Sequence, residues 1–433
     1  MPIINAIDIS DWRKVYIELA KKSYEGKLKP SDLNEDLIRN TYKELNQGAQ
    51  SGYGKGWLPT DKGGQDKTAL ELQKNLYKFS CAKTYAQQLS INNALVKDGK
   101  IQSWNDFKNE VDKINSQYNI NYLNTEYKTA LQSANMAKNW KEYVRNKNNY
   151  PNLKYKTQGD DRVRDEHAAI NEIIVPIDNV FWNSYYPPNG WNCRCYVEQT
   201  NEATTAIPTE IKNVPEEFKL NVGVSGQVFS EDKKAPAPYF ALARTDKNFR
   251  AAFEFSKLAK PTYNEVANYK NGSQIVESIF SDVSDSPKNQ NSAKIIAEKF
   301  AKTLIKIRPD LESGFLTSWK NPEYEINGLI GDRYEGNVYR GWKKKKDQIK
   351  NYIAAYNEKF PKAKISQKYS IVFDITNIDY SKTIDDVAMF FNGKFETGKK
   401  MDSIYFINGD KAVLIKRNFR FKTTLSKLRS LYK

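Results

Sequence analysis

The sequence contains few of the histidine and cysteine residues that metal sites and many enzymes use. Among its 433 residues there are one histidine and three cysteines. Because two cysteines stand in a Cys-x-Cys and the third is isolated, they do not form the disulfide framework of a small secreted protein. The chain begins MPIINAIDISDW, without the basic start and apolar core of a secretory leader. No apolar run reaches the roughly 18 residues of a membrane span. We therefore expect a protein without membrane segments, made in a reducing cytoplasm.

Positive charge is what the sequence has in excess. Lysine and arginine number 68 and aspartate and glutamate 52, which gives a net charge of +16. Residues 321–433 hold 23 basic and 13 acidic residues, so this last quarter carries most of the excess. Such an imbalance favours a polyanionic partner. The length is too great for one ordinary core and predicts two or three domains.

The patterning predicts a helical first part. Apolar residues from Leu72 to Leu89 recur at three- and four-residue steps, as on one face of an amphipathic helix. We expect residues 1–150 to be mostly α-helical, with an irregular stretch at Gly48–Gly64, which contains six glycines. Residues 151–259 predict an irregular α+β lobe, and the polar residues 260–291 predict a linker.

The only histidine and two of the three cysteines lie within one stretch, residues 160–195, which reads DDRVRDEHAAINEIIVPIDNVFWNSYYPPNGWNCRC. In its Pro-Pro-Asn-Gly turn the two prolines have a fixed φ, and the Asn-Gly pair permits a positive φ. The chain therefore leaves the turn in a defined direction, so we expect the two cysteines to point to the same place. One interpretation is a structural Zn²⁺ site formed by His167, Cys193 and Cys195, with a fourth ligand such as Asp165. The alternative is a turn that holds two reduced thiols without metal.

This stretch resembles the signature of the phage Mu F-type head morphogenesis proteins. The matching residues are Asp161, Arg162, Val163, His167, Ala168, Phe181, Trp182, Tyr186, Pro187, Pro188, Asn189, Gly190, Cys193, Arg194 and Cys195. Asn171-Glu172 stands where the family has an Asp-Gly turn. The resemblance covers about the first 260 residues. It implies a minor capsid component that contacts portal and capsid proteins and is found in the virion.

Residues 292–433 predict a small basic α+β domain. A helix is expected from Ser292 to Ile307, and a strongly basic helix from Trp342 to Tyr356. Asn327-Gly328 and Asn408-Gly409 are hairpin signals between apolar runs. The C-terminal hairpin predicts an antiparallel edge for the sheet of this domain.

The motifs of the last domain follow one another in the order Asn321-Pro322-Glu323, Asp332-x-Tyr334, basic helix, Ile371–Ile375 and Asp402-x-Ile404. This order resembles the tRNA-nuclease domain at the end of CdiA-type contact-dependent toxins. That domain is similar in fold to the barnase, EndoU, colicin and RelE ribonucleases. The resemblance implies that the domain cuts tRNA or another RNA, and that an immunity protein protects the producing cell.

Two nuclease chemistries fit these residues. A metal-dependent site of the P-D…(D/E)-x-K type would use Glu323 and Asp332 as carboxylates, but Tyr334 stands where the lysine is required. The preferred alternative is metal-independent RNA cleavage by proton transfer and phosphate stabilisation, with no catalytic cofactor. Its candidate residues are Asp332, Tyr334, Lys368, Asp374, Thr376 and Lys416. We assign proton transfer to Asp332 and Tyr334, and phosphate contact to Lys368 or Lys416. Thr376 is assigned as a hydrogen-bond donor.

The basic helix has two interpretations. Lys343, Lys344, Lys345, Lys346 and Lys350 either contact nucleic-acid phosphates, with a strong dependence on salt, or form a solvated face. This leaves a rival to the ribonuclease hypothesis, in which the chain is a purely structural head protein whose basic end binds packaged nucleic acid without catalysis.

Overall fold

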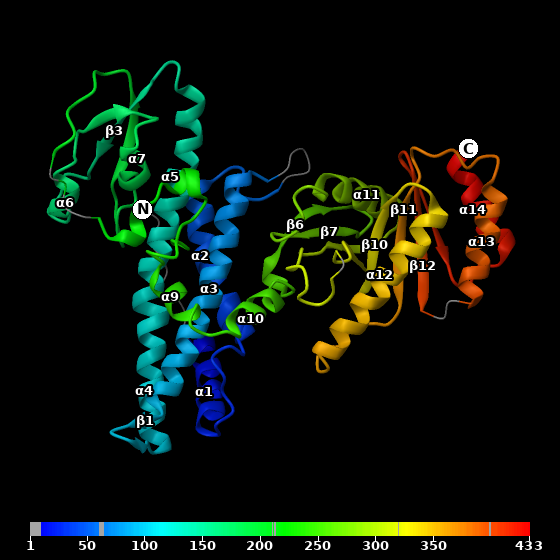
Figure 1. Cartoon of the computed structure of the whole chain (residues 1–433), viewed down its shortest axis with the longest axis horizontal. Helices are drawn as coiled ribbons and strands as arrows, with labels where there is room; N and C mark the ends of the chain where they lie inside the picture. Colours follow the sequence, from blue (N-terminus) through cyan, green and yellow to red (C-terminus); the bar gives the residue numbers. More distant parts are fainter. Residues whose placement is uncertain (1–9, 60–64, 210, 212–213, 319, 398–399) are drawn as a thin grey trace. The chain divides into compact units, whose positions relative to one another are not determined.

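The computed structural model divides the chain between Ser256 and Lys257 into two compact units (Figure 1). It describes residues 10–59, 65–209, 211, 214–318, 320–397 and 400–433. We call the part up to Ser256 the N-terminal unit and the part from Lys257 the C-terminal unit. Among the described residues, none of the helices combines the length and apolar character that a membrane span requires.

Helices dominate the N-terminal unit, which confirms the prediction of a helix-rich first part. They are α1 (Ser10–Tyr24), α2 (Glu35–Tyr53), α3 (Lys67–Ala94), α4 (Trp104–Ser116), α5 (Leu123–Asn146), α6 (Asp165–Ala168), α7 (Phe181–Tyr185), α8 (Val222–Ser225), α9 (Pro238–Ala243) and α10 (Phe249–Ser256). A π-helical segment, Gln117–Tyr122, joins α4 to α5. A two-residue hairpin, β1 (Val96–Lys97) and β2 (Lys100–Ile101), follows α3.

Two glycines let α2 pack closely against α5. A Cβ at Gly52 would lie 2.0 Å from the carbonyl oxygen of Leu131, and one at Gly48 would lie 2.9 Å from that of Tyr127. The prediction of an irregular stretch is therefore wrong for residues 48–53, which belong to α2. Glycine serves there because the neighbouring backbone leaves no room for a side chain.

The centre of the unit contains a buried ion pair. Lys83 on α3 is fully buried, and its Nζ donates to Glu126 Oε2 at 2.5 Å and to the Tyr118 carbonyl at 2.8 Å. The hydroxyl of Tyr239 donates to the other Glu126 oxygen at 2.9 Å. These contacts satisfy both charges, which is the condition for burying them at tolerable cost.

A small antiparallel sheet forms the lobe that follows α5. Its strands β3 (Asn152–Lys156), β4 (Ile174–Pro176) and β5 (Tyr196–Thr200) are arranged in the order β4-β3-β5. Short helices and loops connect the strands, so residues 152–200 form an irregular α+β lobe. The later part of the lobe predicted for residues 151–259 packs elsewhere, with α8 on α5 and with α9 and α10 on α3.

A mixed sheet organises the C-terminal unit. In the described residues it contains eight strands in the order β13-β12-β11-β10-β9-β8-β7-β6. The strands are β6 (Tyr263–Asn268), β7 (Gln274–Ser278), β8 (Leu304–Ile307), β9 (Tyr324–Ile326), β10 (Leu329–Glu335), β11 (Tyr369–Asp374), β12 (Met401–Asn408) and β13 (Lys411–Lys416). The pairs β7/β8, β10/β11 and β11/β12 are parallel and the others antiparallel.

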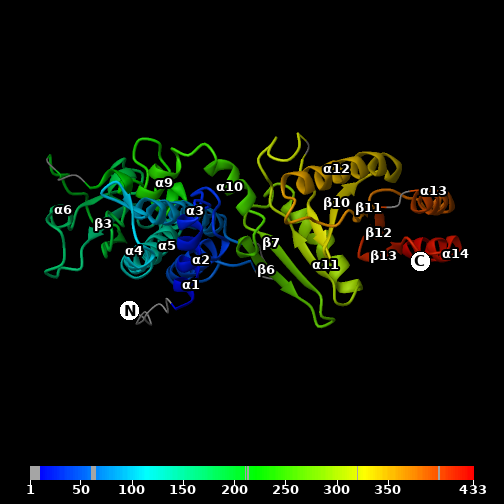
Figure 2. The same cartoon turned by 90° about the horizontal axis from the view of Figure 1, so that it is seen from below.

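Helices cover both faces of this sheet. They are α11 (Ser286–Lys299), α12 (Val338–Lys359), α13 (Ile384–Thr397) and α14 (Phe421–Arg429). Figure 2 shows α12 and α11 on opposite sides of the strands. The alternation within β11 agrees, since Ile371 and Phe373 pack with α12 whereas Val372 packs with α11. The unit therefore has a separate hydrophobic core on each face.

Two sequence predictions fail in this unit. Residues 260–291 are not a linker, because they form β6, β7 and the first part of α11. These strands lie at the edge of the sheet and bury few apolar side chains, among them Val266 and Ile275, so their composition resembles that of a loop. The helix predicted for Ser292–Ile307 ends at Lys299, and β8 follows it.

Candidate functional site

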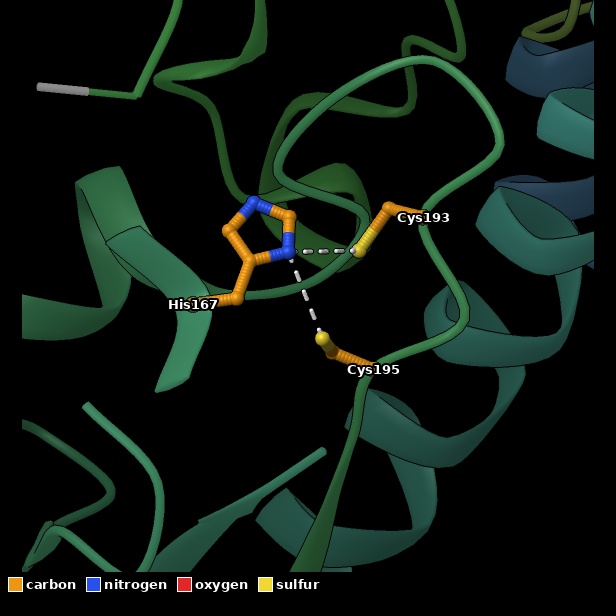
Figure 3. A group of neighbouring side chains, drawn as sticks. All are labelled: His167, Cys193 and Cys195. Carbon is orange, nitrogen blue, oxygen red and sulfur yellow. Dashed lines mark hydrogen bonds between the residues drawn. The ribbon is translucent and has the colours of Figure 1, made fainter. Parts of the chain in front are cut away.

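His167, Cys193 and Cys195 lie together in the lobe (Figure 3). Nδ1 of His167 is 3.8 Å from Sγ of Cys193 and 3.5 Å from Sγ of Cys195. The three atoms all lie within 4.8 Å of one another, and all three side chains are buried. The structure thus brings together the three residues that were predicted from the sequence to be metal ligands.

Short irregular segments position these side chains. His167 lies on α6, and the cysteines lie in the extended segment that leads into β5. The positive φ expected at the Asn-Gly turn is found instead at Asn192, with φ of 58°. Asp165, the predicted fourth ligand, does not belong to the group; within the described residues no other His, Cys, Asp or Glu joins it.

The two thiols differ in acidity. A hydrogen bond from Cys195, together with the nearby His167, holds the pKa of Cys193 well below the ordinary thiol value in spite of burial. The same hydrogen bond and burial raise the pKa of Cys195. Burial lowers the pKa of His167, but its hydrogen bond with Cys193 and the charge there raise it by more. The cluster therefore favours one thiolate beside the imidazole ring.

A second cluster lies in the C-terminal unit, where β10 meets α12. Asp332 is fully buried, and its Oδ2 accepts a hydrogen bond from Lys345 Nζ at 2.8 Å. Its carboxylate also accepts from the backbone N–H groups of Arg333 and Glu323. Burial raises the pKa of Asp332 in spite of these partners. The ammonium group of Lys345, which lies on the predicted basic helix, is the positive charge next to Asp332.

Glu323 stands beside this pair, directly before β9. Burial, followed by the negative charge of Asp332, raises the pKa of Glu323 to about 7. The nearest cation on its own segment, Lys320, is 4.0 Å away. The two carboxylates share one lysine, and their mutual repulsion favours the protonated form of Glu323.

Glu323 also lines a groove of about 510 Å³. Other residues along it are Asp285, Lys288, Arg333, Glu335 and Asp374. Arg333 donates to Asp374 at 2.8 Å and to Glu335 at 3.1 Å. On its other side Glu323 lines a small cavity with Asn289, whose Oδ1 is buried without a hydrogen-bond partner among the described residues.

The structure does not assemble the six residues predicted for metal-independent catalysis. Lys368 precedes β11 and Asp374 ends it, so the two are separated by roughly 20 Å of extended chain. Lys416 lies at the Lys368 end of the sheet, through the pairing of β13 with β12. Tyr334 packs against Phe373 at a ring distance of 6.5 Å. A single cleft does not join these groups.

Two of the remaining candidates have local structural roles. The Oδ1 of Asp374 accepts hydrogen bonds from the backbone and hydroxyl of Thr376, at 3.2 and 2.7 Å. The hydroxyl of Thr376 in turn accepts from the Gly409 backbone at 3.0 Å. These bonds fix the turn after β11 against the β12–β13 hairpin.

The lysines of the basic helix are not equivalent. Lys343 and Lys344 are exposed, and Lys346 and Lys350 are half-buried. Lys345 is buried against Asp332 and does not face solvent, so the prediction that it contacts nucleic acid is corrected. A signal for this was present, because Lys345 lies three residues after Trp342 and four before Ile349, on the apolar face of the helix.

Part of the chain is similar to a known family. Residues 68–198 match the family model described as "Phage Mu protein F like protein". The chain carries a Mu F-like region. This region contains α3, α5 and the lobe with His167, Cys193 and Cys195. The matched range is less than a third of the chain and lies entirely in the N-terminal unit.

Two curated proteins are similar to it. Protein F of Escherichia phage Mu, named for capsid assembly, is 36% identical over 81 residues, which are 19% of this chain and 18% of that protein. The Mu-like prophage FluMu F protein of Haemophilus influenzae is 30% identical over 105 residues, 24% of this chain and 25% of that protein. The chain thus spans a quarter or less of the relatives' lengths. No solved structure matches it.

Proposed function

We propose that this chain is a minor component of a phage or prophage head, with a C-terminal unit that cuts RNA, tRNA in particular. The Mu F-like region supports head assembly, through contacts with capsid and portal proteins, and the chain is carried in the virion. The nuclease uses a divalent cation, held by Glu323 and Asp332. A nuclease of this kind requires an immunity protein in the cell that produces it.

The head function rests on the Mu F-like region. It is similar to a phage protein named for capsid assembly. The similarity covers helices and the His-Cys lobe and does not extend to the C-terminal unit. A pull-down of portal and capsid proteins by residues 10–256 tests this part, and a unit that captures neither contradicts it.

The nuclease function rests on the arrangement of Glu323, Asp332 and Lys345. Glu323 lines the groove and the fully buried Asp332 lies behind it, and their mutual repulsion favours a hard divalent cation such as Mg²⁺, which prefers oxygen ligands. The lysine of the P-D…(D/E)-x-K pattern is missing at Tyr334, but Lys345 supplies an ammonium group from α12, 2.8 Å from Asp332. The unpaired Oδ1 of Asn289, beside Glu323, adds a further oxygen without a hydrogen-bond donor.

Each residue has a definite part in this proposal. Glu323, with Asp332 behind it, would hold the cation, and a divalent cation bound there would supply Lewis-acid chemistry for phosphodiester hydrolysis. Lys345 orients Asp332 and balances its charge. Arg333 and Lys288 line the groove, where a phosphodiester would lie. Lys343 and Lys344 are exposed on α12, so they are available for other phosphates of the RNA. This proposal replaces the metal-independent mechanism, because the six residues assigned to that mechanism do not share a cleft.

The experiment is incubation of the full chain, and of residues 257–433, with total tRNA in the presence of Mg²⁺ or EDTA. We expect cleavage that requires Mg²⁺ and is lost in Glu323→Gln and Asp332→Asn. Lys368→Ala is the matched control, because Lys368 is exposed at the far end of the sheet, and it should cut normally. Cleavage that persists in EDTA or in Glu323→Gln overturns the assignment.

The rival function is nucleic-acid binding without chemistry. The excess of basic residues in 321–433 favours it independently of the groove. In that case the same incubation gives salt-sensitive binding of RNA and DNA with no fragments, and Glu323→Gln has no effect on binding.

A further inference from the structure

The three buried side chains of the lobe have the separations of a tetrahedral metal site. With zinc–sulfur bonds of about 2.3 Å and zinc–nitrogen bonds of about 2.05 Å, a tetrahedron places sulfur and nitrogen about 3.6 Å apart. The distances from His167 Nδ1 to Cys193 and Cys195 are 3.8 and 3.5 Å. Both nitrogen–sulfur distances agree with the tetrahedral value to about 0.2 Å.

The histidine ring is held in the orientation that a metal ligand needs. Nε2 of His167 lies 3.3 Å from the carbonyl oxygen of Asn189, which only accepts hydrogen bonds. Nε2 therefore carries a proton, and Nδ1, which faces the two sulfurs, is the nitrogen that can bind a metal ion between them (Figure 3). The Asn189 side chain is fixed in turn by the hydroxyl of Tyr155, which donates to Oδ1 at 2.9 Å. Such outer partners are characteristic of histidines that bind metals.

The backbone around the cysteines is also anchored. Gln132 on α5 donates to the Cys195 carbonyl at 2.7 Å, and Gln158 donates to the Arg194 carbonyl at 2.9 Å. The guanidinium of Arg194, between the two cysteines, makes two hydrogen bonds with the carboxylate of Asp160. These contacts leave both sulfurs on one side of the segment, facing His167.

We propose that His167, Cys193 and Cys195 bind one zinc ion, with a water molecule as the fourth ligand. Two thiolates and an imidazole in tetrahedral positions form a donor set that zinc prefers over magnesium or calcium. The fourth position faces a cavity of about 620 Å³, which the three ligands line together with Lys128, Gln132 and Arg162 among others. This cavity is large enough to hold water, and its polar lining can bind it.

The zinc ion would join two parts of the Mu F-like region that the sequence separates. His167 lies on α6, while the cysteines precede β5. Hydrogen bonds of the strands link β3 to both β4 and β5, but α6 and its loop have little regular structure of their own. Metal ligation would add a constraint that ties this loop to the segment before β5.

The test is metal analysis of the full chain purified under reducing conditions. We expect one zinc per chain, retained in Cys81→Ser and lost in Cys193→Ser and Cys195→Ser. Cys81 is the matched control because it is also buried, but in α3, where it contacts Ser256. Equal loss of zinc in the Cys81 variant would show that the metal is adventitious and would overturn the proposal.

Cobalt substitution of the wild-type chain gives a second measurement that needs no variant. We expect the intense visible absorption of tetrahedral Co²⁺ and a sulfur-to-cobalt charge-transfer band in the near ultraviolet, both abolished by one equivalent of zinc. A mercurial reagent should release the zinc as it reacts with two thiols per chain. A metal-free protein with no cobalt absorption overturns the proposal, whether or not the variants fold.

Discussion

Replacement of Glu323 by glutamine should stabilise the C-terminal unit above pH 7 while it abolishes cleavage of RNA. Burial and the charge of Asp332 raise the pKa of Glu323 from 4.5 to about 7. Between these two pH values the folded state holds a proton that the unfolded chain has released. The stability that this proton provides is present below pH 4.5 and is lost as the pH rises through 7.

The size of the effect follows from the same values. Since one pKa unit corresponds to about 1.4 kcal/mol, the ionised Glu323 costs the folded unit up to about 3 kcal/mol at pH 8. Glutamine resembles the protonated acid in shape and carries no charge. The variant should therefore match the wild type near pH 4.5 and exceed it by about 2–3 kcal/mol at pH 8.

Urea denaturation of residues 257–433 at pH 4.5, 6 and 8 measures this difference, because this segment contains its own hydrophobic cores. Glu358→Gln, an exposed position on α12, is the control and should leave the pH dependence unchanged. Mg²⁺ at pH 8 should stabilise the wild type and not the Glu323 variant, since it binds the ionised pair. The reasoning is refuted if Glu323→Gln is less stable than the wild type at pH 8.

Three further outcomes test other parts of the structure. Lys83→Met leaves Glu126 buried without its cation and should destabilise the N-terminal unit by about 3–5 kcal/mol in thermal unfolding. The double variant Lys83→Met/Glu126→Gln should recover part of this stability, and an equal loss in the single and double variants would contradict the reasoning. In Gly341→Ala the new Cβ would lie 2.3 Å from the Tyr334 side chain, so the urea midpoint of the C-terminal unit should fall by the equivalent of about 1–3 kcal/mol; an unchanged midpoint would show that the ring moves freely. Removal of zinc by a strong chelator should lower the melting temperature of the N-terminal unit in calorimetry, and an unaltered transition would count against a bound metal.

Local turn chemistry made part of the C-terminal unit predictable. Asn327 and Gly328 adopt φ of 49° and 80°, the positive values that a tight hairpin requires, and β9 pairs with β10 across them. Long-range pairing was not predictable in the same way. The parallel contacts of β11 with β10 and β12 depend on crossovers through α12 and α13, and no short sequence signal specifies them.

The His-Cys cluster was accessible from the sequence for a different reason. His167 is the only histidine, so any site that needs imidazole has to use it. Carboxylates are numerous in the chain and carry no comparable restriction, so Asp165 was a plausible fourth ligand only because it lies near His167 in the chain. On α6, residues two apart point in different directions, which separates the two side chains.

The C-terminal site shows why a spacing motif is a weak guide to a site built from several elements. The P-D…(D/E)-x-K pattern assumes that the lysine and the second carboxylate share a strand, and Tyr334 breaks it. A helix that packs on the same face of β10 can deliver the same ammonium group, and α12 does so with Lys345. What decides whether a lysine belongs to the site is therefore its helical phase. Among four consecutive lysines, Lys345 alone falls in the series Trp342, Ile349, Tyr352 and Tyr356 that faces the sheet, and this phase makes it the partner of Asp332.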